Sequence, residues 1–239
     1  MAMAMAMAKS SGGRISGISS MATRLLLAEL GAAYQRHSGV AVEFEAAGGV
    51  DAAKRVQAGE AFDLVVLASE AIDKLAVGAS VIAASKTDLL RSTVAVAVRA
   101  GAPRPQIGSE EALRRAVLAC ASIGYSTGPS GVALLQLFER WGIAAELQPR
   151  IVQAPAGVPV GELVAAGRVE LGFQQLSELT HLAGIEVLGP MPAGCEIVTT
   201  FAAAICTTST QPQAVRSLLD FLRSPACDAA KRRQGMAPA

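Results

Sequence analysis

The sequence predicts an α/β protein of two lobes, each a mostly parallel sheet flanked by helices, joined by two crossing strands. Three observations predict this fold class. Short β-prone runs alternate with segments whose apolar residues recur at helical spacing, as in βαβ units. Hydrophobic residues make up 51% of the 239 residues and aromatic residues only 4%, which favours close packing of helices on a sheet. Two longer β-like runs, 92–98 and 196–205, divide the series and are expected to cross between the lobes.

The first lobe is expected to comprise residues 14–90 and 201–239. Its strands lead into helices through small residues: Ser19, Ser20 and Met21 follow the first strand, and Gly48 and Gly49 follow the second. This βαβαβα order implies parallel strands with helices on both faces. The expected elements are strand 14–18 and a helix from 21, strand 40–44 and helix 50–58, strand 63–68 and helix 69–76, and tail helices 212–222 and 225–233.

The second lobe, residues 91–200, is expected to hold a second βα series. The series begins after the loop 101–105, where proline and glycine interrupt the preceding strand. The expected elements are helix 110–118, strand 119–124, helix 132–141, strand 150–152, helix 161–166, strand 169–173 and strand 185–188.

The turn formed by residues 124–131 has the features of a seat for a small anion. Pro129 suits the first turn of the following helix, and Ser126 or Thr127 can cap its free N–H groups. Because the helix dipole places about half a positive charge at a helix N-terminus, such backbone donors can face an anion. An ordinary strand-to-helix turn is the alternative, since glycine-rich turns are common in α/β folds.

Four further turns lie, like the one that carries Ser130, at the carboxyl ends of expected strands. They are centred on Ser20, Gly49, Val158 and Gln175. Ligands of open α/β sheets bind outside the carboxyl ends of the strands. The five turns are therefore expected to converge on one cleft between the lobes.

Composition and charge exclude several classes of function. The net charge of +1, without a basic stripe, gives no support for nucleic-acid binding, and no apolar run is long enough to insert into a membrane. The four cysteines form no CxxC pair, and His37 and His181 stand alone, so neither a metal nor another cofactor is expected. Pairing of the four cysteines into two disulfides is the alternative, although buried thiols in a reducing compartment fit the cysteine pattern better.

Residues 1–13, in which Met and Ala alternate, are expected to be a leader or tag without a fixed fold. They lack the order of a secretory signal, in which basic residues precede an apolar core and a small-residue cleavage site. The expected location is therefore the cytoplasm for the sequence as it stands. It is the periplasm if the leader has replaced a natural signal.

Over nearly the whole chain from Arg14, the sequence resembles the type II periplasmic-binding-protein fold, and within it the molybdate-binding components of ABC transporters. The stretches that carry the resemblance are Ser19-Ser20-Met21, residues 59–64 with Ala68, Pro129-Ser130-Gly131, residues 171–173 and residues 233–236. The resemblance implies a solute-binding protein with a small anion between its lobes and a transporter permease as a partner. It places anion contacts at Ser20, Gly49, Ser130, Val158 and Gln175.

Three departures from the molybdate-type pattern point to a different anion. Gly49 replaces a serine, Gln175 replaces a tyrosine, and Arg91-Ser92 stands where a small residue and Asn are usual. The guanidinium of Arg91 is a fork that matches a carboxylate, and the amides of Gln174 and Gln175 can both donate and accept hydrogen bonds. The expected ligand is thus an organic di- or tricarboxylate, with molybdate or tungstate as the alternative. The expected ligand-binding set is Ser19, Ser20, Met21, Gly48, Gly49, Arg91, Ser92, Ser126, Thr127, Ser130, Val158, Pro159, Gln174 and Gln175.

An enzymatic role is the other hypothesis, because bacterial aconitate isomerases are similar to this fold. The resemblance then implies an allylic proton shift on a tricarboxylate, which needs a base beside the methylene carbon and donors for an enolate-like state. No catalytic residue is assigned. Glu45, Asp51 and Glu178 lie near the turns but are typical of helix-end or surface charges. Tyr125 is a further candidate, but an unperturbed phenol, with a pKa near 10, is a poor base.

Overall fold

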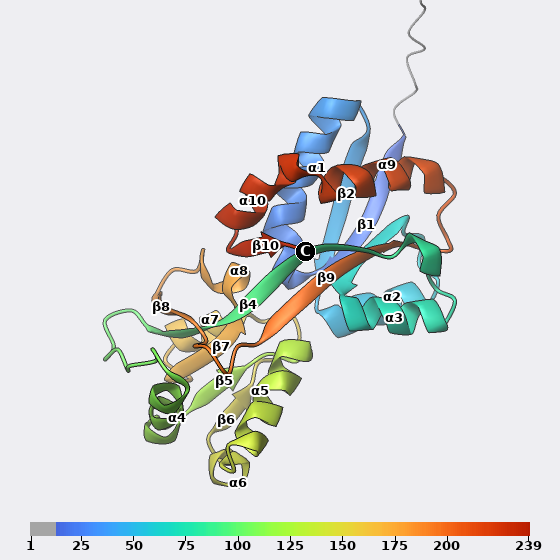
Figure 1. Cartoon of the computed structure of the whole chain (residues 1–239). Helices are drawn as coiled ribbons and strands as arrows, with labels where there is room; N and C mark the ends of the chain where they lie inside the picture. Colours follow the sequence, from blue (N-terminus) through green and yellow to red (C-terminus); the bar gives the residue numbers. More distant parts are fainter. Residues whose placement is uncertain (1–12) are drawn as a thin grey trace, which may run out of the picture.

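The described residues, 13–239 of the computed structural model, form a ten-stranded sheet flanked by helices (Figure 1). Residues 1–12, and with them almost all of the expected leader, lie outside the described part. The strands are β1 (Arg14–Ser20), β2 (Ala41–Ala47), β3 (Leu64–Ala68), β4 (Thr87–Arg99), β5 (Ile123–Tyr125), β6 (Ile151–Gln153), β7 (Leu171–Gln175), β8 (Ile185–Pro190), β9 (Val198–Ile205) and β10 (Met236–Pro238).

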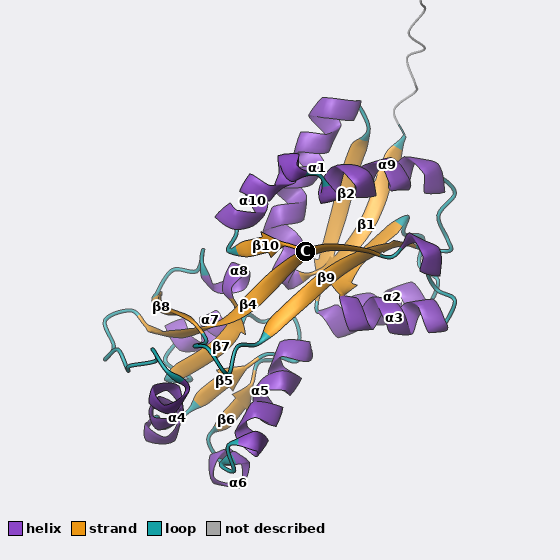
Figure 2. Ribbon diagram, in the orientation of Figure 1, coloured by secondary structure: helices purple, strands orange, loops and turns teal. Residues whose placement is uncertain are grey.

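The sheet has the order β2-β1-β3-β9-β4-β7-β5-β6, while β8 and β10 both pair with β4 outside this path. β1 pairs in parallel with β2 and β3, and β5 pairs in parallel with β6 and β7. β9 is antiparallel to β3 and β4, and β4 is antiparallel to β7. Two parallel groups of strands are thus joined through the antiparallel strands β4 and β9, as Figure 2 shows.

β4 changes its partner along its length. Its residues from Thr87 to Thr93 pair with β9, and those from Val94 to Ala97 pair with β7. At the change, the Val94 N–H donates to the Ile197 carbonyl oxygen at 2.9 Å, so the chain returning towards β9 stays beside β4. The two segments therefore run side by side where the two parts of the sheet meet.

The helices cover both faces of each part of the sheet. Those beside β1, β2 and β3 are the 3-10 turn η1 (Met21–Thr23), α1 (Arg24–Ser38), α2 (Gly49–Gln57), α3 (Ser69–Val77), η2 (Ala83–Ser85), α9 (Pro212–Arg223), η3 (Pro225–Cys227) and α10 (Asp228–Arg233). Those beside β5, β6 and β7 are α4 (Glu110–Ala119), α5 (Pro129–Arg140), α6 (Ala144–Leu147), α7 (Val160–Ala165) and α8 (Leu176–Leu179).

Side-chain alternation along the central strands divides the core between these helices. In β3, Leu64 and Val66 pack in the cluster that contains α1 and α9 residues, whereas Val65 and Leu67 pack with α2 and α3. Successive side chains of a strand point to opposite faces, so a strand buried on both faces must be apolar throughout. In β4, Val94 and its alternate neighbours likewise pack with α4 and α5, and the small Ala95 and Ala97 pack towards α8.

The expected strand 119–124 is mostly wrong, because only β5 forms there. Ala119 ends α4, and the next residues connect α4 to β5. Arg150 Nη1 donates to the carbonyl oxygens of Leu118 and Cys120 at 2.9 and 2.8 Å, so these groups are satisfied without a strand partner. α6 and β10 were not expected from the sequence.

Each of the four cysteines is a free thiol, which decides the open question of disulfides. Burial raises the pKa of Cys120 and Cys195 to about 11 and that of Cys206 to about 12. Such thiols stay protonated near neutral pH and are poor nucleophiles. None of the helices in the described part is both long enough and apolar enough to span a bilayer.

Candidate functional site

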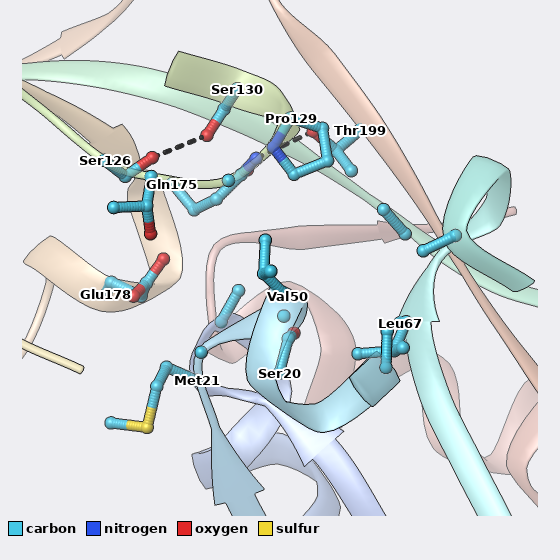
Figure 3. A pocket seen from close by; sticks show the side chains of 18 of the residues that line it. Ser20, Met21, Val50, Leu67, Ser126, Pro129, Ser130, Gln175, Glu178 and Thr199 are labelled. Atoms are coloured by element: carbon cyan, nitrogen blue, oxygen red, sulfur yellow. Dashed lines mark hydrogen bonds between the residues drawn. The ribbon is translucent and has the colours of Figure 1, made fainter. Parts of the chain in front are cut away.

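A cavity of about 390 Å³ lies between the two parts of the molecule (Figure 3). One wall comes from the end of β1 with η1, the start of α2 and α3. The facing wall comes from the turn before α5, the loop before α7 and the start of α8. The sequence-predicted residues that line it are Ser20, Met21, Gly48, Gly49, Ser126, Thr127, Ser130, Val158, Pro159, Gln174 and Gln175.

Several helices, including α2 and α5, begin at this cavity with uncapped N-termini. α2 and α5 begin after Gly48 and Gly128, and no side chain caps the first-turn N–H groups of either helix. Among the α-helices of residues 13–239, only α4 has such a cap, in which the Ala112 N–H donates to Ser109 Oγ at 3.2 Å. The first N–H groups of a helix have no partner within it, and the helix dipole favours negative charge there. The starts of α2 and α5 are thus suited to an anionic ligand.

Serine hydroxyls add side-chain donors on both walls. Ser20 is 7% exposed, and its Oγ has no hydrogen-bond partner. Across the cavity, the hydroxyls of Ser126 and Ser130 lie 3.2 Å apart, so each can donate to the other or to a ligand. An unpaired buried hydroxyl costs free energy, and a ligand that accepts a hydrogen bond from Ser20 would remove that cost.

Gln175 also carries a buried polar atom without a partner. Its Nε2 donates to Thr199 Oγ1 at 2.8 Å, which leaves Oε1 unsatisfied. The Thr199 hydroxyl can accept or donate. Rotation of the Gln175 amide by half a turn would let Oε1 accept from Thr199 and would direct the N–H groups to the free position. The pair can therefore match either a donor or an acceptor.

Gly131 fixes the shape of the turn before α5. A Cβ at this position would lie 1.9 Å from the Ser126 carbonyl oxygen. Only glycine permits so close an approach of the backbone to the helix. The approach holds Ser126 against Ser130, which is the arrangement that gives this wall its two hydroxyls.

The positive charge at the cavity comes from lysines that sequence reasoning missed. Lys54 of α2 and Lys74 of α3 line the cavity with exposed side chains, and neither forms an ion pair within residues 13–239. Glu70, one turn before Lys74, lines the same wall. Spacing could have identified Lys54 as a cavity residue. It lies four residues after Val50, the first residue of the expected helix 50–58, and residues four apart share a helix face.

Arg91 does not reach the cavity, which corrects the expectation of a guanidinium fork. Its side chain is exposed, and its Nε donates to the Pro238 carbonyl oxygen at 3.3 Å. In the antiparallel ladder Arg91 lies between Thr200 and Ala237, and its neighbours Leu90 and Ser92 point to the other face. Strand alternation and the unexpected pairing with β10 thus direct this arginine away from the ligand space.

Ser19 and Ser92 are also absent from the cavity lining, contrary to expectation. Ser19 is fully buried, and its Oγ donates to the Ser20 carbonyl oxygen at 3.3 Å. Ser92 is fully buried on β4, and its Oγ has no partner. Alternation along β1 explains the difference between Ser19 and Ser20, because successive residues point to opposite faces.

Glu178 is the titratable residue whose environment differs most from the sequence-based interpretation. It is half-buried in the cavity wall (Figure 3), not at the surface. Its Oε1 accepts a hydrogen bond from Gln174 Nε2 at 2.8 Å. Burial raises the pKa of Glu178 from 4.5 to about 7, against the lowering effect of this hydrogen bond. Perturbed carboxyls in a cleft are frequent at functional sites.

The other carboxylates and the tyrosine considered as bases do not line the cavity. Glu45 forms an ion pair with Arg55 at 2.9 Å, and Asp51 lies exposed in the first turn of α2. Tyr125, the last residue of β5, packs against the core. Within residues 13–239, no group of three or more His, Cys, Asp and Glu side chains could hold a metal ion.

The family model for bacterial extracellular solute-binding proteins matches residues 15–237. The chain belongs to this family. This solute-binding family member is 37% identical over 209 residues to an aconitate isomerase from a Pseudomonas species, with 85% of this chain and 79% of that protein covered.

Solved structures of the same architecture include the periplasmic molybdate-binding protein of Azotobacter vinelandii, with a TM-score of 0.77, 19% identity and coverage of 93% of this chain and 98% of that one. The sulfate-binding protein of Mycobacterium tuberculosis gives a TM-score of 0.77 and 18% identity, with 95% and 87% covered. The tungstate ABC transporter structure from Geobacter sulfurreducens has a TM-score of 0.73 and 15% identity, and the match covers 91% of this chain and 97% of that one. These likenesses confirm the predicted fold class and the resemblance to molybdate-binding proteins.

Proposed function

We propose that this family member binds a small organic di- or tricarboxylate in the cavity. The observation that carries the proposal is the donor set around it: Lys54, Lys74, the buried hydroxyl of Ser20 and the uncapped starts of α2 and α5. Several separate donors suit a ligand with several separate carboxylates. The cavity volume of about 390 Å³ also falls in the range of about 300–1,000 Å³ typical of sites for small organic molecules.

Residues 14–90 with 201–239 and residues 91–200 would act as two lobes that close on the ligand. β4 and the segment leading into β9 are the connections between them, so they are the proposed hinge. A permease of an ABC transporter is the proposed partner if binding serves transport. Support for this partner comes from structural neighbours whose names refer to ABC transporters.

Thermal unfolding with added anions tests the choice of ligand. A ligand that binds only the folded state raises the melting temperature. Aconitate and propane-1,2,3-tricarboxylate should raise it more than molybdate or tungstate at equal concentration. A larger shift with molybdate would contradict the carboxylate proposal and favour an oxyanion-binding protein.

Catalysis is the second candidate function, in which the bound acid is aconitate and its double bond moves by an allylic proton shift. Two observations favour it over binding alone. Glu178 places a carboxyl in the wall of an anion site, which weakens binding when ionised but is what proton transfer requires. The curated relative of 37% identity is itself an aconitate isomerase.

Incubation of the protein with cis-aconitate tests this activity directly. The trans isomer, separated by chromatography, should accumulate faster than in buffer. No conversion above the buffer rate would leave the binding function alone.

A further inference from the structure

We propose that Glu178 is the general base that removes the methylene proton of the bound acid, and that Gln174 is the positioning residue that holds its carboxylate. The proposal rests on the isomerase function given above and names the residue that performs it. Its basis is the placement of Glu178 at the cavity wall together with the hydrogen bonds that orient its carboxylate.

The carboxylate of Glu178 is held by a short chain of hydrogen bonds. The Gly161 N–H at the start of α7 donates to Gln174 Oε1 at 3.3 Å, so the NH₂ group of this amide must point the other way. That group donates to Glu178 Oε1 at 2.8 Å. Oε2 of Glu178 has no hydrogen-bond partner within residues 13–239 and is left to contact a substrate. The arrangement fixes one oxygen and leaves the other for proton transfer.

The helix that carries Glu178 is tied to the opposite wall of the cavity. Ser177 Oγ, one residue earlier in α8, donates to the Ala22 carbonyl oxygen at 2.9 Å. Ala22 lies in η1, directly after Ser20 and Met21. Glu178 and the unpaired hydroxyl of Ser20 therefore belong to elements in direct contact, so a base and a donor can act on the same ligand.

The charged groups near Glu178 line two different pockets. A small pocket of about 110 Å³, which shares Glu178 with the main cavity, is also lined by Arg24 of α1 and His181 of the loop after α8. Lys54, Lys74 and Glu70 lie in the main cavity on α2 and α3. None of them forms an ion pair with Glu178. Burial is accordingly the main cause of its raised pKa.

The proposed step is balanced without a further reactant. The C–H bond of the methylene carbon breaks as an O–H bond forms on Glu178, and its electron pair spreads over the three-carbon unit and the adjoining carboxylate. The lysines and the N-terminus of α2 would stabilise that charge. Glu178 then returns the proton to the other end of the unit, which moves the double bond and restores the carboxylate.

The test compares Glu178→Gln with the wild type in two assays, conversion of cis-aconitate and binding of propane-1,2,3-tricarboxylate. The amide has nearly the same shape and keeps an oxygen that can accept from Gln174, but it cannot take the proton. Conversion should fall by about 10²–10⁴-fold, as for loss of a general base, while binding should be unchanged or tighter. Glu162→Gln is the matched control, since Glu162 is exposed on α7 and does not line the cavity.

Gln174→Met tests the positioning role through the pH profile. Loss of its hydrogen bond should raise the pKa of Glu178 further, so the acidic limb of kcat/KM should move to higher pH. An unmoved limb would overturn the positioning role.

The remaining outcomes separate the two proposals. Conversion of cis-aconitate by Glu178→Gln at the wild-type rate would contradict the assignment of Glu178 as the base but not the isomerase function. If Glu178→Gln lost binding as well as conversion, the assignment of Glu178 as the base would also be contradicted, because the residue would then have a structural role. If the wild-type protein did not convert cis-aconitate, both the isomerase function and the assignment of Glu178 as its base would be contradicted.

Discussion

Lys54 and Lys74 place the charge of the cavity on two helices of the same wall, whereas Arg91 faces away from it. Both lysine side chains are exposed, so each retains much of its hydration and is worth less than a buried charge. Two such groups nevertheless suit a ligand that carries more than one carboxylate. We therefore expect the side chains of the cavity wall, rather than the shared fold, to select the anion.

Replacement of these lysines should weaken binding of the carboxylate ligand. Lys54→Ala and Lys74→Ala are each expected to lower the affinity for propane-1,2,3-tricarboxylate by about three- to tenfold, as for an exposed charged partner. Arg91→Ala is the matched control and should leave the affinity unchanged. Calorimetric titration measures all three variants. A loss in Arg91→Ala equal to that of the lysine variants would contradict this account of the site.

Gly131 permits a second prediction at the residue scale. Gly131→Ala would place a Cβ 1.9 Å from the Ser126 carbonyl oxygen, so the turn must move. We expect a loss of about 1–3 kcal/mol in the free energy of unfolding, as for overpacking, and weaker ligand binding. Gly128→Ala is the control, because its Cβ would meet only Ser126 Oγ, at 4.0 Å. Equal stability of the two variants in urea would show that the close approach is not required.

The sequence predicted much of the cavity because strand ends can be recognised from local patterns. Ser20, Gly49, Ser130, Val158 and Gln175 all line it, as expected for turns at the carboxyl ends of strands. The position of Arg91 could not be predicted in this way, since it depends on which face of β4 is covered. The burial of Glu178 likewise depends on how η1 and the loop before α7 pack over α8.

At the scale of elements, β10 explains why the C-terminal tail belongs to the fold. Met236 is 4% exposed and packs in the core cluster with residues of α1 and α9, while Pro238 ends the pairing with β4. This three-residue strand has no periodic signal of its own, so sequence patterns cannot identify it. By contrast, most boundaries of the longer helices and strands were predicted to within a few residues.

Removal of the Met236 side chain should therefore destabilise the whole protein. Met236→Ala is expected to lower the free energy of unfolding by about 2–5 kcal/mol through the lost burial and the cavity that remains. Val77→Ala is the control, since Val77 is 91% exposed at the end of α3. Urea denaturation measures both variants. A loss below about 0.5 kcal/mol in Met236→Ala, the range of surface changes, would place β10 outside the cooperative fold.

At the scale of the whole molecule, one cavity joins groups that are far apart in the sequence. Ser20 and Lys54 come from one part of the sheet, and Ser130 and Glu178 come from the other, with β4 and β9 between them. Ligand binding, lobe closure and proton transfer would therefore depend on the same space. We expect this space to hold a polycarboxylate against the carboxyl group of Glu178.

The sign of the pH dependence follows from that placement. With a pKa raised to about 7, Glu178 is mostly neutral below that pH and mostly charged above it. An anionic ligand binds the neutral form better, so affinity should be greatest below about pH 7 and should fall as the pH rises through it. Turnover needs the charged form of the base, so kcat/KM should change in the opposite direction.

Calorimetric titration with propane-1,2,3-tricarboxylate at about pH 6 and about pH 8 tests whether the bound acid lies against Glu178, because this acid has no double bond to move and only its binding is measured. Between the two conditions the wild-type affinity should fall by up to about tenfold more than that of Glu178→Gln, in which residue 178 no longer titrates. An equal pH dependence in the two proteins, or binding of molybdate alone, would contradict this placement of the acid.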